Sequence, residues 1–371
     1  MRADVLKRQR SAMAAASLDA LVAISPENFA YTTGFVVPSQ PLMRWRHAMA
    51  VITADGREAL VGVDMEETTI RQKAGGVELR VWGEFTDDPM AALAGLLTDL
   101  GLSGGTIGIE MDYLPAGDFS RLAQHLPDAR LRPAERIYSQ LRQIKTADEL
   151  ALLRRLSRIS DQAIADSFRA VKAGSTEMDI AAALTRSVYA QGAQQFKLMI
   201  VATGERSQLP NVGPSERILQ PGDVCRVEIF SIIDGYHAGV CRTAVVQHAP
   251  PHAERIWENL TACKHLLLDI IKPGASSKHI YDIYLAKLSE LKLPPISFVG
   301  HGIGVHLHED PYLGPYGDVP LEAGMVLGIE PLVYRTGHGF GMQNKDMVAV
   351  TRSGCELLSD VTDTDRLIVV A

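Results

Sequence analysis

The spacing of apolar residues changes along the second half of the chain from a helical repeat to a repeat of two, and this change limits the folds available to it. Between Thr146 and Gly192 the apolar residues recur at helical spacing, and Thr146 with Glu149 has the pattern of a capping box at a helix start. From Val224 the period is two, which predicts strands on both sides of a turn at Asp234-Gly235. The expected elements are strands at 224–233 and 240–247, helices at 253–272 and 276–291, and strands at 325–334 and 346–351. We therefore expect an α+β domain with an antiparallel sheet over 141–371.

The first half alternates short buried strand patterns with helical segments. An opening helix leads to a strand pattern at 18–24, and Asp55-Gly56 separates two further strands in a hairpin signal. Another short strand is expected near 106–109. Residues 127–143 carry no strong period, so we place the boundary there and expect a smaller α/β domain over 1–140.

Charge and composition exclude several classes of protein. A formal net charge of -7 argues against a nucleic-acid surface. No apolar run reaches the roughly 18 to 20 residues that cross a bilayer, and we find no secretory leader pattern. The 4 cysteines include no Cys-x-x-Cys pair, which argues against a disulfide framework or a zinc knuckle. We expect a soluble cytoplasmic protein that binds neither nucleic acid nor membrane.

Histidines gather in one glycine-rich run. His301, His306 and His308 lie within residues 299–311, and Glu330 follows in the phrase Gly-Ile-Glu-Pro. Imidazoles and a carboxylate among glycines indicate a site that closes around a small ligand. The alternation of the run puts His306 on the opposite face from His308, so we interpret His306 as a structural residue.

Four ordered motifs resemble the pita-bread family, which comprises methionine aminopeptidase, aminopeptidase P, prolidase and creatinase. They are Gly300-His301-Gly302-Ile303-Gly304, His308-Glu309, the phrase 324–331 and the strand 346–351 before Gly354. The resemblance covers the whole second half and, more loosely, the first half. It implies a pita-bread domain over 141–371 after a creatinase/prolidase-like N-terminal domain over 1–140.

In the peptidases of that family, two aspartates, one histidine and two glutamates hold two divalent metals. Carried over by position, these ligands fall on Glu228, Gly239, His301, Glu330 and Lys345. Glycine offers no side-chain ligand, and an ammonium repels a divalent ion: one pair of unit charges at 4 Å costs roughly 4 kcal/mol at an effective dielectric near 20. We therefore expect no catalytic metal and no other cofactor, and the outline is closest to the metal-free creatinase branch.

The remaining groups suggest a hydrolase. Glu228 could attack the substrate or activate water, His301 or His308 could protonate a leaving nitrogen, and Glu330 could orient a histidine or pair with Lys345. We interpret the chain as a metal-independent, creatinase-like enzyme that cleaves a C–N bond in a guanidine, amidine or amide of an amino-acid-like zwitterion. The catalytic histidine of creatinase aligns with Asn211, so the creatinase mechanism itself does not transfer.

Further residues are candidates for binding the small-molecule substrate. They are Lys345, Asn211, Arg44, Arg46, His237 and Arg335. Resemblance to creatinase implies a homodimer in which the N-terminal domain, through Arg44 or Arg46, contributes to the neighbour's site. The same residues also have an alternative interpretation without function. In it Glu228 forms a salt bridge, Lys345 only neutralises Glu330, and the arginines are solvated.

Two other functions compete with this interpretation. The first is a metal-dependent Xaa-Pro aminopeptidase or dipeptidase, which the resemblance alone would assign. The second is a non-catalytic ligand-binding pseudoenzyme of the same fold. Metal content separates the first from the others, and a co-purified ligand separates turnover from binding alone.

Overall fold

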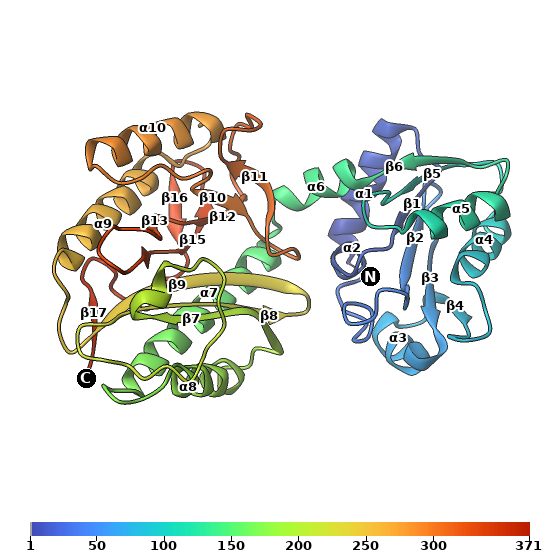
Figure 1. The fold of residues 1–371 in the computed structure, drawn as a ribbon. Coiled ribbons are helices and arrows are strands. Elements are labelled where there is room, and N and C mark those ends of the chain that lie inside the picture. Colours follow the sequence, from blue (N-terminus) through green and yellow to red (C-terminus); the bar gives the residue numbers. More distant parts are fainter. Residues whose placement is uncertain (1) are drawn as a thin grey trace. The chain divides into compact units, whose positions relative to one another are not determined.

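The computed structural model describes residues 2–371 and divides the chain into two compact units. One unit ends at Arg142 and the other comprises Gln143–Ala371 (Figure 1). Each unit has its own sheets and core, and the expected combination of a smaller α/β unit with an α+β unit is confirmed. Within residues 2–371, no helix combines the length and apolarity needed to cross a membrane.

The first unit is built on a six-stranded sheet in the order β4-β3-β2-β1-β5-β6. Its strands are β1 (Ala20–Ala23), β2 (Met49–Thr53), β3 (Glu58–Val63), β4 (Glu78–Trp82), β5 (Thr106–Ile109) and β6 (Arg130–Pro133). Its helices are α1 (Ala3–Ala16), α2 (Pro26–Thr33), η1 (Asp64–Glu66), α3 (Glu67–Ala74), α4 (Pro89–Asp99), α5 (Ala116–His125) and α6 (Glu135–Gln143). The sheet lies between α1 and α2 on one side and α4 and α5 on the other (Figure 1).

Local signals predicted the opening helix α1 and the strands β1, β2, β3 and β5 of this unit. The Asp55-Gly56 hairpin forms, and Gly56 takes a φ of 99°, a backbone conformation that favours glycine. The segment 127–143, in which no strong period was found, contains β6 and α6. Only Tyr138 is fully buried along α6, so its apolar face is too short to give a visible period.

The second unit contains two helix-backed sheets. A four-stranded sheet has the order β17-β9-β8-β7 and a five-stranded sheet has the order β11-β10-β12-β15-β16. The helices are α7 (Ala147–Arg169), α8 (Glu177–Ala190), η2 (Gly204–Gln208), α9 (Ala253–Ile270) and α10 (Ser277–Glu290). The strands are β7 (Gln195–Thr203), β8 (Val224–Ile233), β9 (Tyr236–Val246), β10 (Gly300–Gly302), β11 (Glu309–Leu313), β12 (Val326–Ile329), β13 (Leu332–Val333), β14 (Met342–Gln343), β15 (Asp346–Val350), β16 (Cys355–Leu357) and β17 (Ile368–Val370).

The helices cover the outer faces of these sheets (Figure 1). Helices α7 and α8 accompany the first sheet, and α9 and α10 accompany the second. The capping box at Thr146 forms as predicted, with the helix beginning at Ala147. An isolated bridge between Cys241 and Lys345 joins the two sheets, and the strand ends around this bridge carry the candidate site.

Candidate active site around Lys345

Four strands bring the polar residues of the site together. Strand β8 places Glu228 opposite Cys241 of β9, and Cys241 in turn bridges to Lys345. His301 lies in β10, which pairs with β12, and Glu330 follows directly after β12. Residues far apart in the sequence therefore converge at one point because their strands are neighbours in the two sheets.

The ammonium of Lys345 lies at the centre of this cluster. Its Nζ is 3.0 Å from Glu228 Oε1, 2.7 Å from Glu330 Oε1 and 3.4 Å from His301 Nε2. His301 also places Nε2 2.9 Å from Glu330 Oε1 and Nδ1 2.7 Å from the carbonyl oxygen of Gly302. All four side chains are buried. We refer to Glu228, His301, Glu330 and Lys345 as the lysine cluster.

Opposite charges keep Lys345 and Glu330 ionised although both are buried. Burial acts to lower the pKa of Lys345, but the carboxylates of Glu228 and Glu330 outweigh it and leave this pKa above its ordinary value. Burial acts to raise the pKa of Glu330, but Lys345 and His301 hold it well below its usual range. An ammonium between carboxylates is therefore the stable state near neutral pH.

His308 lies between the lysine cluster and solvent. Its ring stacks on His301 with centroids 3.6 Å apart and planes 11° apart, and it is half-buried. Burial, together with His301 and Lys345, lowers the pKa of His308 to about 3. This imidazole is therefore neutral near pH 7, so it can accept a hydrogen bond but is a poor proton donor to a leaving group.

Phe230 fills the space beside Gly239. The two residues face each other across β8 and β9, and a Cβ atom on Gly239 would lie 2.2 Å from the Phe230 ring. Lys345 Nζ is 4.3 Å from the centroid of the same ring, within cation–π range. The ring thus occupies the room that a side chain at position 239 would need.

Arg226 and Gln343 extend the cluster and were not predicted from the sequence. The fully buried Arg226 donates from Nη1 to Gln343 Oε1 at 3.1 Å, and Gln343 donates from Nε2 to Glu330 Oε2 at 3.3 Å. The guanidinium of Arg226 also lies 5.1 Å from the Tyr334 ring centroid. Arg226 precedes Glu228 by two residues on a strand, so strand periodicity could have placed both on one face.

The other predicted residues lie outside the lysine cluster. Asn211 is exposed in the loop between η2 and β8, and Arg335 is exposed after β13. His237, a candidate for substrate binding, is buried: its backbone N–H donates to the Gly304 carbonyl at 2.7 Å, and burial lowers its pKa to about 4. In the first unit Arg44 is exposed, and Arg46 donates from Nε to Glu84 at 2.7 Å.

Two segments of the chain match known families. Residues 151–352 match metallopeptidase family M24, and residues 6–144 match the creatinase/prolidase N-terminal domain. The chain belongs to metallopeptidase family M24. The resemblance to the pita-bread family is thereby confirmed.

Relatives of this M24 protein carry peptidase names. It is 27% identical over 359 residues to the "Probable dipeptidase PepE" of Mycobacterium tuberculosis, covering 95% of this chain and 94% of that protein. It is 24% identical over 356 residues to the Xaa-Pro dipeptidase of Pyrococcus horikoshii, covering 95% of each. The fold matches the X-Pro aminopeptidase of Thermotoga maritima with a TM-score of 0.86 at 23% identity, over 98% of this chain and 99% of that one.

The residues of this M24 protein do not fit the two-metal centre that the resemblance implies. Three donors, from His301, His308 and Glu330, do lie within 4.8 Å of one another. Lys345 Nζ, however, lies 2.7 Å from Glu330 Oε1 and 3.4 Å from His301 Nε2, so an ion about 2 Å from these atoms would meet the ammonium. Gly239 supplies no ligand, and Phe230 occupies its side-chain space.

The expected function is wrong. We expected a metal-independent, creatinase-like hydrolase of a small nitrogen compound, whereas the relatives of this M24 protein are named dipeptidases and Xaa-Pro dipeptidases. The lowered pKa of His308 also removes one of the two groups expected to protonate the leaving nitrogen. The coarser expectation was a relationship to hydrolases that act on C–N bonds. It is confirmed, because the family and the named relatives are peptidases and a peptide bond is a C–N bond.

Proposed function

We propose that this chain binds short peptides of the dipeptide class next to the lysine cluster, and that it does not hydrolyse them by the two-metal route. The observation that carries the proposal is the position of the Lys345 ammonium, 3.0 Å from Glu228 and 2.7 Å from Glu330. A fixed cation there occupies the space between the two carboxylates that would otherwise hold an ion. The names of the dipeptidase relatives support a peptide as the ligand.

Aromatic rings beside the cluster suit a peptide with an apolar side chain. The His308 ring centroid is 6.2 Å from that of Tyr312 and 6.3 Å from that of Phe298. Tyr312 is 41% exposed, so its ring is available to a ligand. A prolyl or aliphatic group can pack on such rings, while the neutral imidazole of His308 accepts a hydrogen bond from a peptide nitrogen.

Binding and turnover must be measured separately to test the proposal. Calorimetric titration with Leu-Pro should show binding, whereas proline release should stay at background with Mn²⁺ present and after chelation. His308→Gln should weaken binding about fivefold or more, since glutamine keeps an acceptor but lacks the ring that packs beside the ligand. His265→Gln is the matched control because His265 is an exposed histidine on α9 paired with Asp365. Proline release that rises with added Mn²⁺ would overturn the proposal.

A metal-dependent Xaa-Pro dipeptidase is the second candidate. The names of the relatives favour it, as does the approach of the His301, His308 and Glu330 donors to within 4.8 Å of one another. It requires Lys345 to leave the space beside Glu330. Protein purified without chelator should then contain about one divalent ion per chain by mass spectrometry. The cytoplasmic location and the homodimer expected from the sequence remain predictions.

A further inference from the structure

The second unit contains a cavity whose wall is bonded to Arg226, next to the lysine cluster. Its volume is about 760 Å³, within the range of about 300 to 1,000 Å³ that holds small organic ligands. Three segments of the second unit line it: 205–210, 294–296 and 332–335. Most of the lining side chains are apolar or aromatic. The cavity therefore suits a ligand with an apolar body.

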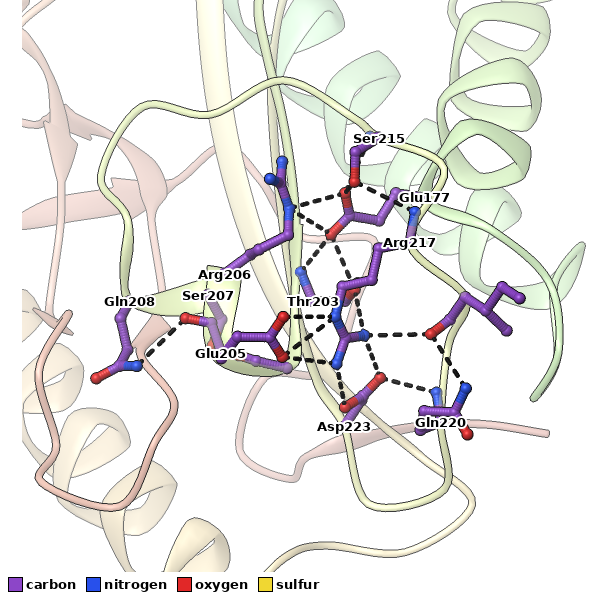
Figure 2. Close-up of polar contacts among 12 residues, drawn as sticks. Glu177, Thr203, Glu205, Arg206, Ser207, Gln208, Ser215, Arg217, Gln220 and Asp223 are labelled. Carbon is purple, nitrogen blue, oxygen red and sulfur yellow. Dashed lines mark hydrogen bonds and ion pairs between the residues drawn. The ribbon is translucent and has the colours of Figure 1, made fainter.

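The loop that forms one wall is held firmly in place. We call residues 204–223 the rim loop; it runs from η2 to the start of β8. The carboxylate of Glu177 accepts hydrogen bonds from Thr203, the residue before the rim loop, and from Ser215 within it. Arg217 joins Glu205 and Asp223 across the rim loop (Figure 2). These contacts, fixed by a buried carboxylate, preform the wall before any ligand binds.

One uncompensated positive charge faces this cavity. Of the charged lining residues, Glu205 is paired with Arg217 at 2.8 Å and Arg206 with Glu177 at 3.1 Å. Arg335 is exposed and, within residues 2–371, makes no ion pair. Its guanidinium is free to bind a carboxylate in a bidentate manner.

The cavity shares a wall with the lysine cluster. Arg226 Nη2 donates to the Pro210 carbonyl at 3.0 Å, and Pro210 lines the cavity. On its other side Arg226 reaches Glu330 through Gln343. Strand β13, which also lines the cavity, begins two residues after Glu330. The cavity and the lysine cluster are therefore linked by Arg226 and Gln343 and by the two-residue step from Glu330 to β13.

We infer that this cavity receives the C-terminal residue of a bound peptide, with its carboxylate on Arg335 and its side chain against Leu209 and Val333. The inference rests on the proposed peptide binding and extends it: peptides one residue longer than a dipeptide gain contacts here. Arg335 therefore distinguishes a free C-terminal acid from an amide.

Calorimetric titration of the intact chain with Leu-Pro-Leu and with Leu-Pro-Leu amide tests the inference. The wild-type chain should bind the acid about tenfold more tightly than the amide, and Arg335→Gln should erase that difference. Arg352→Gln removes the same charge from an exposed loop residue outside the cavity and should preserve it. Leu209→Glu, at a residue 46% exposed, should weaken binding of the acid more than that of the amide. Circular dichroism confirms folding of each variant.

The outcomes separate this inference from the proposed function. Equal affinity of the wild-type chain for acid and amide, or a preference that survives Arg335→Gln, overturns the inference and leaves peptide binding intact. Failure of both Leu-Pro and Leu-Pro-Leu to bind overturns the proposed function and the inference together. Binding of the acid that is lost selectively in Arg335→Gln supports both.

Discussion

Replacing Lys345 by methionine should remove the ammonium between Glu228 and Glu330 and so convert the lysine cluster into a site for a divalent ion. Methionine keeps most of the side-chain volume and removes only the ammonium. Glu228 and Glu330 then remain buried without the cation that lies 3.0 Å and 2.7 Å from them. Their carboxylates, with the imidazoles of His301 and His308, form a donor set that suits Mn²⁺ or Zn²⁺.

The loss of stability should be large. Removing one partner of a buried ion pair costs about 3 to 5 kcal/mol, and Lys345 serves two carboxylates and the Phe230 ring at once. We therefore expect the free energy of unfolding of Lys345→Met to fall by an amount near the upper end of that range. An ion bound with a Kd of about 10 µM would restore about 2.7 kcal/mol at 1 mM.

Urea denaturation with and without 1 mM MnCl₂ measures both effects. The wild-type chain should unfold at the same urea concentration in both conditions, and only Lys345→Met should be stabilised by the ion. Lys145→Met is the matched control, because Lys145 is another buried lysine, 3.2 Å from the buried Glu309. It should lose stability without recovery by Mn²⁺. Unchanged stability of Lys345→Met, absence of recovery, or stoichiometric Mn²⁺ uptake by the wild-type chain would refute the reasoning.

Three further predictions concern the surroundings of the cluster. Gly239→Asp should lower the free energy of unfolding by about 1 to 3 kcal/mol through overpacking, and the same substitution should cost less in a Phe230→Ala background; equal costs in the two backgrounds, measured by urea denaturation, would contradict this. Arg242→Met should lower the free energy of unfolding by about 3 to 5 kcal/mol, because it leaves the buried Asp161 and Asp346 without their cation. A loss under about 1 kcal/mol would contradict this prediction. The pKa of His237 is about 4 in the folded chain, below the unfolded value near 6.5. As the pH is lowered, the unfolded chain is therefore protonated before the folded chain, and the free energy of unfolding falls. Between pH 7 and 5 this amounts to about 2 kcal/mol, and His237→Asn should flatten the measured slope.

Local patterns in the sequence predicted the elements that depend on local interactions. Strand β8 spans the 224–233 segment expected from its period, and α7 begins directly after the Thr146 cap. The strand expected at 325–334 is instead interrupted after Ile329, because Pro331 cannot donate a backbone hydrogen bond. Helix α6 escaped prediction because its buried face is confined to about one turn.

The site was predictable where ordered motifs carried it and not where side chains met through tertiary packing. The resemblance brought Glu228, His301, Glu330 and Lys345 together. The link from Arg226 to Gln343 could not be predicted, because it joins β8 to β14 across two sheets. The contact of Phe230 with Gly239 could have been found, since a two-residue turn at Asp234-Gly235 places these residues opposite each other.

Positions 230, 239 and 345 depend on one another and together resist conversion to the five-ligand arrangement that the resemblance implies. An acid introduced at 239 collides with the ring of Phe230. A smaller residue at 230 opens a hole and deprives the ammonium of its aromatic neighbour. An acid at 345 sets three carboxylates against one another. Each of these changes made alone gives a less stable protein, so the ring, the glycine and the ammonium hold one another in their present arrangement.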